Sequence, residues 1–119
     1  MEFTSLSKKW EVQAYSNSLE ELIKSVLKAC AGHLPNTALG HLKGFLEFDR
    51  GSVFASSTLI PPEIALRTEG KYDGGDMVLG VTLIFMDLDV EFLSDVLSRA
   101  AMEVCEQLGC KLKDTTEVL

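Results

Sequence analysis

The fold is decided by residues 40–60, which read GHLKGFLEFDRGSVFASSTLI. From Gly40 to Phe48, polar and apolar residues alternate with a period of two, which is typical of a strand with one buried side. Asp49–Ser52 has the composition of a turn, and Val53–Ile60 reads as a second strand. A four-residue loop predicts three facing pairs: Phe48 with Val53, Leu46 with Ala55 and Gly44 with Ser57. The stretch therefore predicts a β-hairpin whose apolar sides coincide.

A helix is predicted immediately before this hairpin. Ser18 followed by Glu21 is the capping-box pattern, in which each residue satisfies a backbone N–H at the helix start. Apolar residues then recur at helical spacing over Leu19–Cys30, so one side of the helix is apolar. Either Gly32 or the turn 34–36 ends it.

A second, longer helix is predicted near the C-terminus. Its N-cap is Asp87 or Asp89, and Gly109 is well placed as the residue just past its end. Its apolar side consists of Leu93, Val96, Leu97, Ala100, Ala101, Val104, Cys105 and Leu108. Each helix thus has one apolar side that must be covered by another element.

The remaining segments supply the other strands. Trp10–Tyr15 reads as a first strand, and Ile64–Thr68 reads as a brief one. Met77–Met86 is apolar on both sides, which favours a central position in the sheet. Glu69–Asp76 is rich in glycine and is predicted to be a mobile turn. Cys110–Leu119 is predicted either to add a short final strand or to fray.

The predicted order of elements is β-α-β-β-(β)-β-α. Two helices with one apolar side each must both lie on a sheet. The simplest arrangement is an α+β fold, an antiparallel sheet of about four strands with both helices on one face, of ferredoxin-like character. Residues 1–119 are expected to form a single domain, with residues 1–8 and 112–119 as loosely ordered ends.

Composition excludes several functional classes. The 119 residues include 11 Lys and Arg against 18 Asp and Glu, which gives a formal net charge of −7. Such a chain is repelled by phosphate backbones and anionic lipid, so neither nucleic acid nor a membrane is expected as a partner. Residues 1–9 lack the apolar core of a secretory signal, and the longest apolar stretch is too short to span a bilayer. We therefore expect a cytoplasmic protein.

The cysteines give no sign of catalysis. Cys30 and Cys105 lie on the apolar sides of the predicted helices, where a thiol behaves as a small inert hydrophobe. Cys110 follows the second helix and is expected to be exposed. No spacing indicates a disulfide framework or a zinc site, and no nucleophile–base pair is evident. We expect no catalytic residue and no enzymatic activity.

Two histidines are the candidate ligands for a metal or a small molecule. His33 and His41 lie on either side of the loop 34–40 and could meet at a metal with Cys30 or an acidic residue. A simpler interpretation places His33 at a helix C-terminus, where a partly positive imidazole suits the helix dipole, and His41 at the start of a strand. On that interpretation no metal and no cofactor is expected.

The most informative feature is the side of the sheet that faces away from the helices. If the aliphatic residues of the hairpin contact the helices, Phe45 and Phe54 point the other way, and nothing in the chain covers them. An uncovered apolar patch of this kind usually marks an interface. The interface candidates are Phe45, Phe54, Lys43, Ile84 and Met86. The predicted partner is a second copy of the chain, giving a homodimer, or another protein.

Two segments resemble a known family. Leu42–Leu46 (LKGFL) is similar to the Lys-Gly-Phe strand in the C-terminal domain of CobW-type GTPases. Leu83–Leu93 (LIFMDLDVEFL) resembles the apolar strand, short turn, Leu-Asp and acidic helix start of the same domain. The GTPase domain itself is missing, with neither a Walker A loop nor a cysteine-rich metal motif, and His41 stands where the family has an arginine. The resemblance covers roughly residues 10–105.

Two functional hypotheses follow. The resemblance implies a free-standing accessory domain that serves a GTPase in metal or corrinoid handling, without an activity of its own. Together with the uncovered phenylalanines, this favours a non-enzymatic accessory or interaction module. The alternative is a small-ligand or metal-sensing module of a ferredoxin-like dimer, in which His33, His41 and the turn Glu69–Asp76 border the site.

Overall fold

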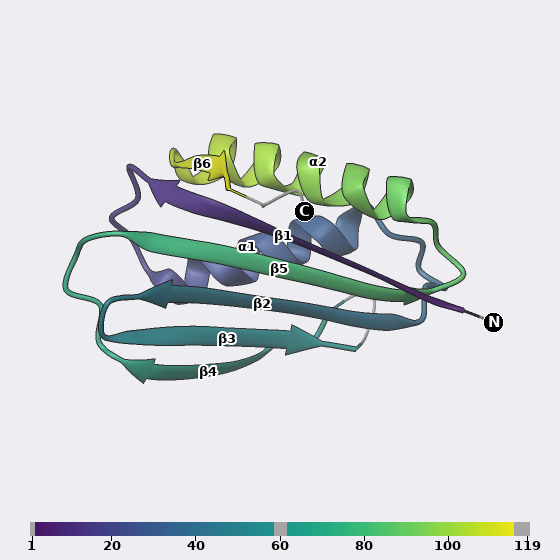
Figure 1. Cartoon of the computed structure of the whole chain (residues 1–119), viewed down its shortest axis with the longest axis horizontal. Helices are drawn as coiled ribbons and strands as arrows, with labels where there is room; N and C mark the ends of the chain where they lie inside the picture. The colour runs from purple at the N-terminus through teal and green to yellow at the C-terminus, as the bar shows by residue number, and fades with distance from the viewer. Residues whose placement is uncertain (1, 59–61, 116–119) are drawn as a thin grey trace.

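The computed structural model describes residues 2–58 and 62–115, which form an α+β fold (Figure 1). Its elements are β1 (Phe3–Gln13), α1 (Leu19–Gly32), β2 (Gly40–Phe48), β3 (Gly51–Ser57), β4 (Ala65–Gly70), β5 (Met77–Met86), α2 (Val90–Leu108) and β6 (Lys111–Asp114). The strands form one sheet in the order β4-β3-β2-β5-β1-β6, and every neighbouring pair is antiparallel. The predicted antiparallel sheet with two helices is confirmed, although the sheet has six strands rather than about four.

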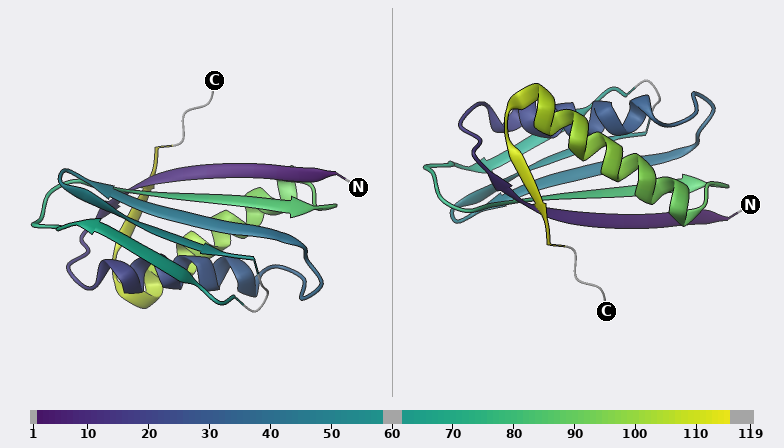
Figure 2. Two further views of the ribbon diagram at one scale, coloured as in Figure 1. Left: turned by 90° about the horizontal axis from the view of Figure 1, so that it is seen from below. Right: turned by 90° about the horizontal axis from the view of Figure 1, so that it is seen from above.

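Both helices cover the same face of the sheet, and the core lies between the two layers (Figure 2). From the helices, Leu22, Ile23 and Leu97 are fully buried, as their spacing predicted. From β5, the residues at every second position face the helices: Met77, Leu79, Val81, Leu83 and Phe85. β5 lies between β2 and β1, so its predicted central position is confirmed.

The helix starts follow the capping rules. The Ser18 hydroxyl accepts a hydrogen bond from the backbone N–H of Glu21 at 3.3 Å, and the Asp89 carboxylate accepts one from the N–H of Phe92 at 2.7 Å. Asp89, rather than Asp87, is therefore the N-cap of α2. Asp87 instead adopts a positive φ of 57° in the turn that links β5 to α2.

Strand β1 differs most from expectation. It begins at Phe3 rather than Trp10, so residues 3–8, which we expected to be loosely ordered, form most of a strand paired with β5. Its sequence contains serine, threonine and lysine because one side of this strand faces solvent, and the apolar pattern is therefore weak. The strand ends at Gln13, because Ala14 has a positive φ of 58°.

The short final strand, one of two predicted alternatives, is formed by β6. It pairs with residues 10–13 of β1, and the N–H of Thr115 donates to the carbonyl of Lys9 at 2.9 Å. Residues 112–114, expected to be loosely ordered, thus lie within the sheet. The rest of that expected segment, 116–119, lies outside the described residues.

The hairpin forms with a register two residues away from the predicted one. A two-residue turn at Asp49 and Arg50 pairs Phe48 with Gly51, so Phe45 lies directly opposite Phe54. The reason is Gly51, which belongs to β3 and not to the turn: a Cβ there would lie 2.1 Å from the Glu69 carbonyl on β4. A shift of two keeps every side chain on its predicted side.

The segments after the hairpin follow the sequence in outline. β3 ends at Ser57, and the end of its predicted range, residues 59–60, lies outside the described residues. The predicted brief strand Ile64–Thr68 is β4, shifted to Ala65–Gly70 and paired with β3 at the edge of the sheet. In the following turn, the Tyr72 hydroxyl donates to the Gly75 carbonyl at 2.8 Å.

Candidate functional site

The candidate site is the open face of the sheet, which is the face away from the helices (Figure 2). The side chains that reach it come from alternate positions of β1, β2, β3, β4 and β5, because successive residues of a strand point to opposite sides. At its centre are Phe45 on β2 and Phe54 on β3, whose ring centroids lie 6.5 Å apart with an interplanar angle of 43°. This distance is typical of a stabilising aromatic pair.

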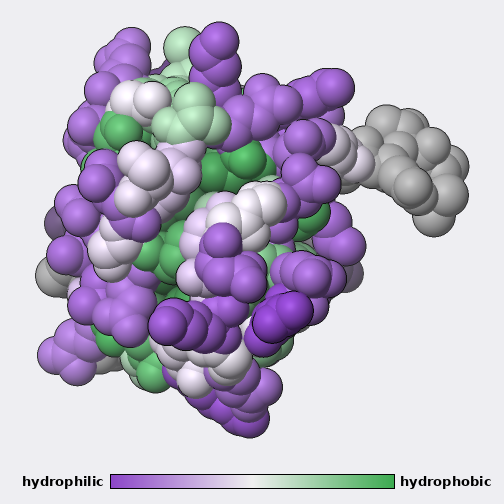
Figure 3. Space-filling view, turned by 90° about the vertical axis from the view of Figure 1, so that its left-hand side faces the viewer, coloured by the Kyte–Doolittle hydropathy of each residue, from purple (hydrophilic) through white to green (hydrophobic). Residues whose placement is uncertain are grey.

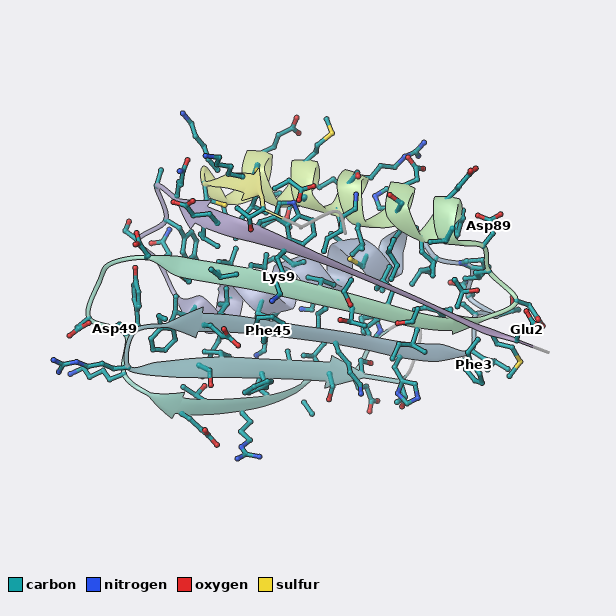
Figure 4. All side chains as sticks on the ribbon, in the orientation of Figure 1. Glu2, Phe3, Lys9, Phe45, Asp49 and Asp89 are labelled. Carbon is teal, nitrogen blue, oxygen red and sulfur yellow. The ribbon has the colours of Figure 1, made fainter. Side chains whose placement is uncertain are left out.

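The Phe45 ring lies on a glycine of the neighbouring strand. Gly80 of β5 is directly opposite Phe45, and a Cβ added at Gly80 would lie 2.2 Å from two atoms of the ring. On the far side of Gly80, the Lys9 ammonium lies 5.8 Å from the centroid of the same ring. Figure 4 shows Lys9 and Phe45 next to one another at the middle of the face. The glycine thus creates the space in which the ring lies against the sheet.

The five predicted interface residues all lie on the open face. Phe54 is 48% exposed, Phe45 is partly buried and Lys43 is exposed. Ile84 and Met86 of β5 point to the same side and are partly buried. Phe45 and Phe54 are direct neighbours across the hairpin, whereas the predicted pairing of Leu46 with Ala55 would have made them diagonal neighbours. The shorter turn accounts for this difference.

Several residues of this face were missed in the sequence. Phe3, 58% exposed, pairs with Met86 at one end of the face, in a segment whose strand pattern is weak. Leu39, 64% exposed, lies at the same end, where its carbonyl accepts a hydrogen bond from the Met86 N–H at 2.9 Å. Gly80 did carry a signal, since a glycine inside an apolar strand often marks the close approach of another group.

A hollow of about 640 Å³ lies on the same face over β2, β3 and β4. The two phenylalanines line it together with charged residues from β2 and β4. One of these, Arg67, forms an ion pair with Glu69 on its own strand. Lys43, in contrast, has no ion-pair partner among the described residues. The hollow therefore combines an aromatic floor with a positive charge that remains open to an incoming group.

At the end of the molecule that carries the β2–β3 turn, hydrophilic residues surround several hydrophobic ones (Figure 3). A second hollow there, of about 530 Å³, is lined by acidic residues that include Glu47, Asp49 and Asp73. Carboxylates in this number suggest a cation at first sight. Yet no group of three or more His, Cys, Asp or Glu side chains in the described residues is arranged to hold a metal ion.

The two candidate histidines are not brought together. His33 is the C-cap of α1, and its Nε2 lies 2.5 Å from Oε1 of Glu103 on α2, so it links the two helices. His41 is exposed on the open side of β2. His33 therefore lies in the helix layer and His41 on the opposite face of the sheet, so that the sheet separates the two side chains.

Two of the three cysteines are arranged differently from expectation, since Cys110 is buried and Cys105, predicted on the buried side of its helix, is partly exposed. Cys30 is fully buried, and burial together with the Glu103 charge raises its pKa to about 12. Cys110, expected to be exposed, is 4% exposed, and burial followed by the nearby Cys105 raises its pKa. The left-handed turn at Gly109, with a φ of 67°, sends the chain back toward β1 and places Cys110 inside. Cys105 is the partly exposed thiol.

Comparisons with known protein families, with curated proteins and with solved structures find no match for this chain. The resemblance of Leu42–Leu46 and Leu83–Leu93 to the CobW C-terminal domain therefore stays a prediction. Within the described residues, neither helix is long and apolar enough to cross a membrane. The open face is accordingly the feature from which function has to be argued.

Proposed function

We propose that this chain is a non-enzymatic interaction module that docks through the open face of its sheet. One observation carries the proposal: Phe45 and Phe54 form an aromatic pair on the face that no helix covers. An antiparallel sheet with one solvated face ordinarily places polar residues there. Aromatic residues at the centre of such a face are the composition expected of an interface core with a polar rim.

The connectivity supports a known architecture for this role. Without β3 and β4, the chain reads β1-α1-β2-β5-α2-β6 with the sheet order β2-β5-β1-β6. We infer that this is a ferredoxin-like arrangement extended by one hairpin at its edge. Phe54 belongs to that added hairpin, so the extension contributes half of the aromatic pair.

The proposed partner is a protein. The resemblance to the CobW C-terminal domain supports an accessory role beside a GTPase in metal or corrinoid handling. The contacts on the open face support association with a protein surface, either another chain or a second copy. The separation of His33 from His41 removes the shared site on which the alternative metal-sensing hypothesis depended.

The test compares two exposed apolar residues on opposite layers. Phe54→Lys places a charge at the centre of the open face, whereas Met102→Lys, at a residue 67% exposed on α2, places one on the helix layer. Burial of one aromatic side chain contributes about 1.5–3 kcal/mol, so Phe54→Lys should weaken association by at least about tenfold. Sedimentation of each variant measures this loss, and circular dichroism verifies the fold. Equal association of both variants would contradict the proposal.

A further inference from the structure

Strand β2 carries opposite charges at equal distances from its central aromatic residue. On the open side it presents Lys43, Phe45 and Glu47 in succession, with one residue between neighbours. Each charge therefore lies about 7 Å from Phe45 along the strand. Lys43 and Glu47 are both exposed, and neither has an ion-pair partner among the residues described.

This spacing makes the face complementary to itself. We propose that the partner of the open face is a second copy of this chain, stacked so that Lys43 of one subunit faces Glu47 of the other. A two-fold axis in the plane of the face, perpendicular to β2 and passing through Phe45, produces this contact twice. The axis also places Phe45 against Phe45 of the partner subunit. Stacking the two β2 strands in the same direction would instead place like charges together.

The surroundings of Phe45 are compatible with close stacking. Its ring lies against Gly80, which has no side chain to lift it from the sheet, and stacked sheets pack about 10 Å apart. Phe54 lies beside Phe45 and extends the apolar contact toward β4. Twisted sheets diverge away from their centre, so the contact concentrates on β2 and β3.

Two other charged residues, Lys9 and Arg67, lie in the same row across the sheet as Phe45. Arg67 is paired with Glu69 on β4, and Lys9 lies over the Phe45 ring. The formal net charge of −7 opposes any self-association, but it is screened at physiological ionic strength. The pairs at Lys43 and Glu47 therefore determine the relative orientation of the two copies.

Charge reversal in two separate chains tests this register. Lys43→Glu makes a subunit with two acidic positions on β2, and Glu47→Lys makes one with two basic positions. Each variant alone should self-associate roughly tenfold more weakly than the wild type, because two like-charge contacts replace two opposite ones. An equimolar mixture should regain association within about threefold of the wild type. Native mass spectrometry should show mixed dimers when one of the two variants is labelled with ¹⁵N, which separates the subunit masses.

A double variant with both charges exchanged and a control variant on a helix complete the design. Lys43→Glu combined with Glu47→Lys in one chain reverses both charges and should restore self-association. Lys24→Glu, on α1, has the same charge change away from the open face and should leave association unchanged. Circular dichroism and urea unfolding show whether each variant is folded.

The inference rests on the proposed function, and the two can fail separately. If Phe54→Lys abolishes the dimer while the charge variants leave it unchanged, the face is an interface but the register is wrong. If the mixture of single variants does not regain association, the register is likewise wrong. If wild-type chains remain monomeric at high micromolar concentration, the second copy is overturned as the partner, whatever the charge variants do. If the wild type dimerises and Phe54→Lys dimerises as strongly as Met102→Lys, the proposed function itself fails.

Discussion

The two sides of one sheet are built from the same strands, yet they differ in what covers them. On the helix side, Leu42 and Leu46 of β2 and Leu79 of β5 are at most 1% exposed. On the open side, the intervening residues of these strands include a lysine, a glutamate, a glycine and Phe45. Alternation sends every second residue of a strand to the open side, but it does not explain why some of those residues are aromatic. We propose that the aromatic residues on the open side serve a contact with another protein surface.

The largest effect that separates the two sides is the loss of a core residue. Leu46→Ala should lower the free energy of unfolding by about 2–5 kcal/mol, because it leaves a cavity between β2 and the helices. Phe54→Ala, on the next strand but on the open side, should lower it by less than about 1 kcal/mol in the separated subunit. Urea unfolding at low protein concentration measures both. An equally large loss at Phe54 would show that it belongs to the core.

A smaller effect is expected at the one place where the open side is closely packed. Gly80→Ala should destabilise the subunit by about 1–3 kcal/mol, because the added methyl group occupies the position of the Phe45 ring. In the double variant Gly80→Ala with Phe45→Ala the clash is removed, so the combined loss should be smaller than the sum of the single losses. Strict additivity in urea unfolding would mean that the ring does not lie on the glycine.

The comparison of the two sides also explains which features of the fold could be predicted from the sequence. The helices, the N-cap at Ser18 and the strand Met77–Met86 were predictable, since each depends on local spacing and capping chemistry. The N-cap of the second helix was narrowed to Asp87 or Asp89, and the structure has Asp89. These elements form the covered side, where the apolar pattern is dense. The side of each hairpin residue was predictable for the same reason.

The differences arise where distant segments determine the structure. The early start of β1 at Phe3 depends on pairing with β5, which a run rich in serine and lysine does not reveal. The hairpin register depends on the contact of Gly51 with β4, and the burial of Cys110 depends on the return of the chain to β1. The pairing of Phe45 with Gly80 is likewise a contact between separate strands. Local periodicity contains none of these contacts.

The smallest effect is expected for the ion pair between the two helices that cover one side of the sheet. Glu103→Gln removes the ion pair with His33 between α2 and α1 but keeps the side-chain size. Because the Glu103 side chain is 44% exposed, the expected loss is at most about 1 kcal/mol. Thermal unfolding at neutral pH should detect a small decrease in Tm. A loss as large as that of Leu46→Ala would mean that the packing of the two helices depends far more strongly on the His33–Glu103 ion pair.

The central claim, that a second copy of this chain covers the open face, is tested most directly by hydroxyl-radical footprinting across protein concentration. Phe54 on the open face and Met102 on α2 are both exposed in the single subunit. The oxidation of each residue is compared only with its own oxidation at other protein concentrations. The account predicts that oxidation of Phe54 falls several-fold as the concentration rises from low to high micromolar, whereas oxidation of Met102 does not change. Unchanged oxidation of Phe54 over that range would contradict a face covered by a second copy of this chain.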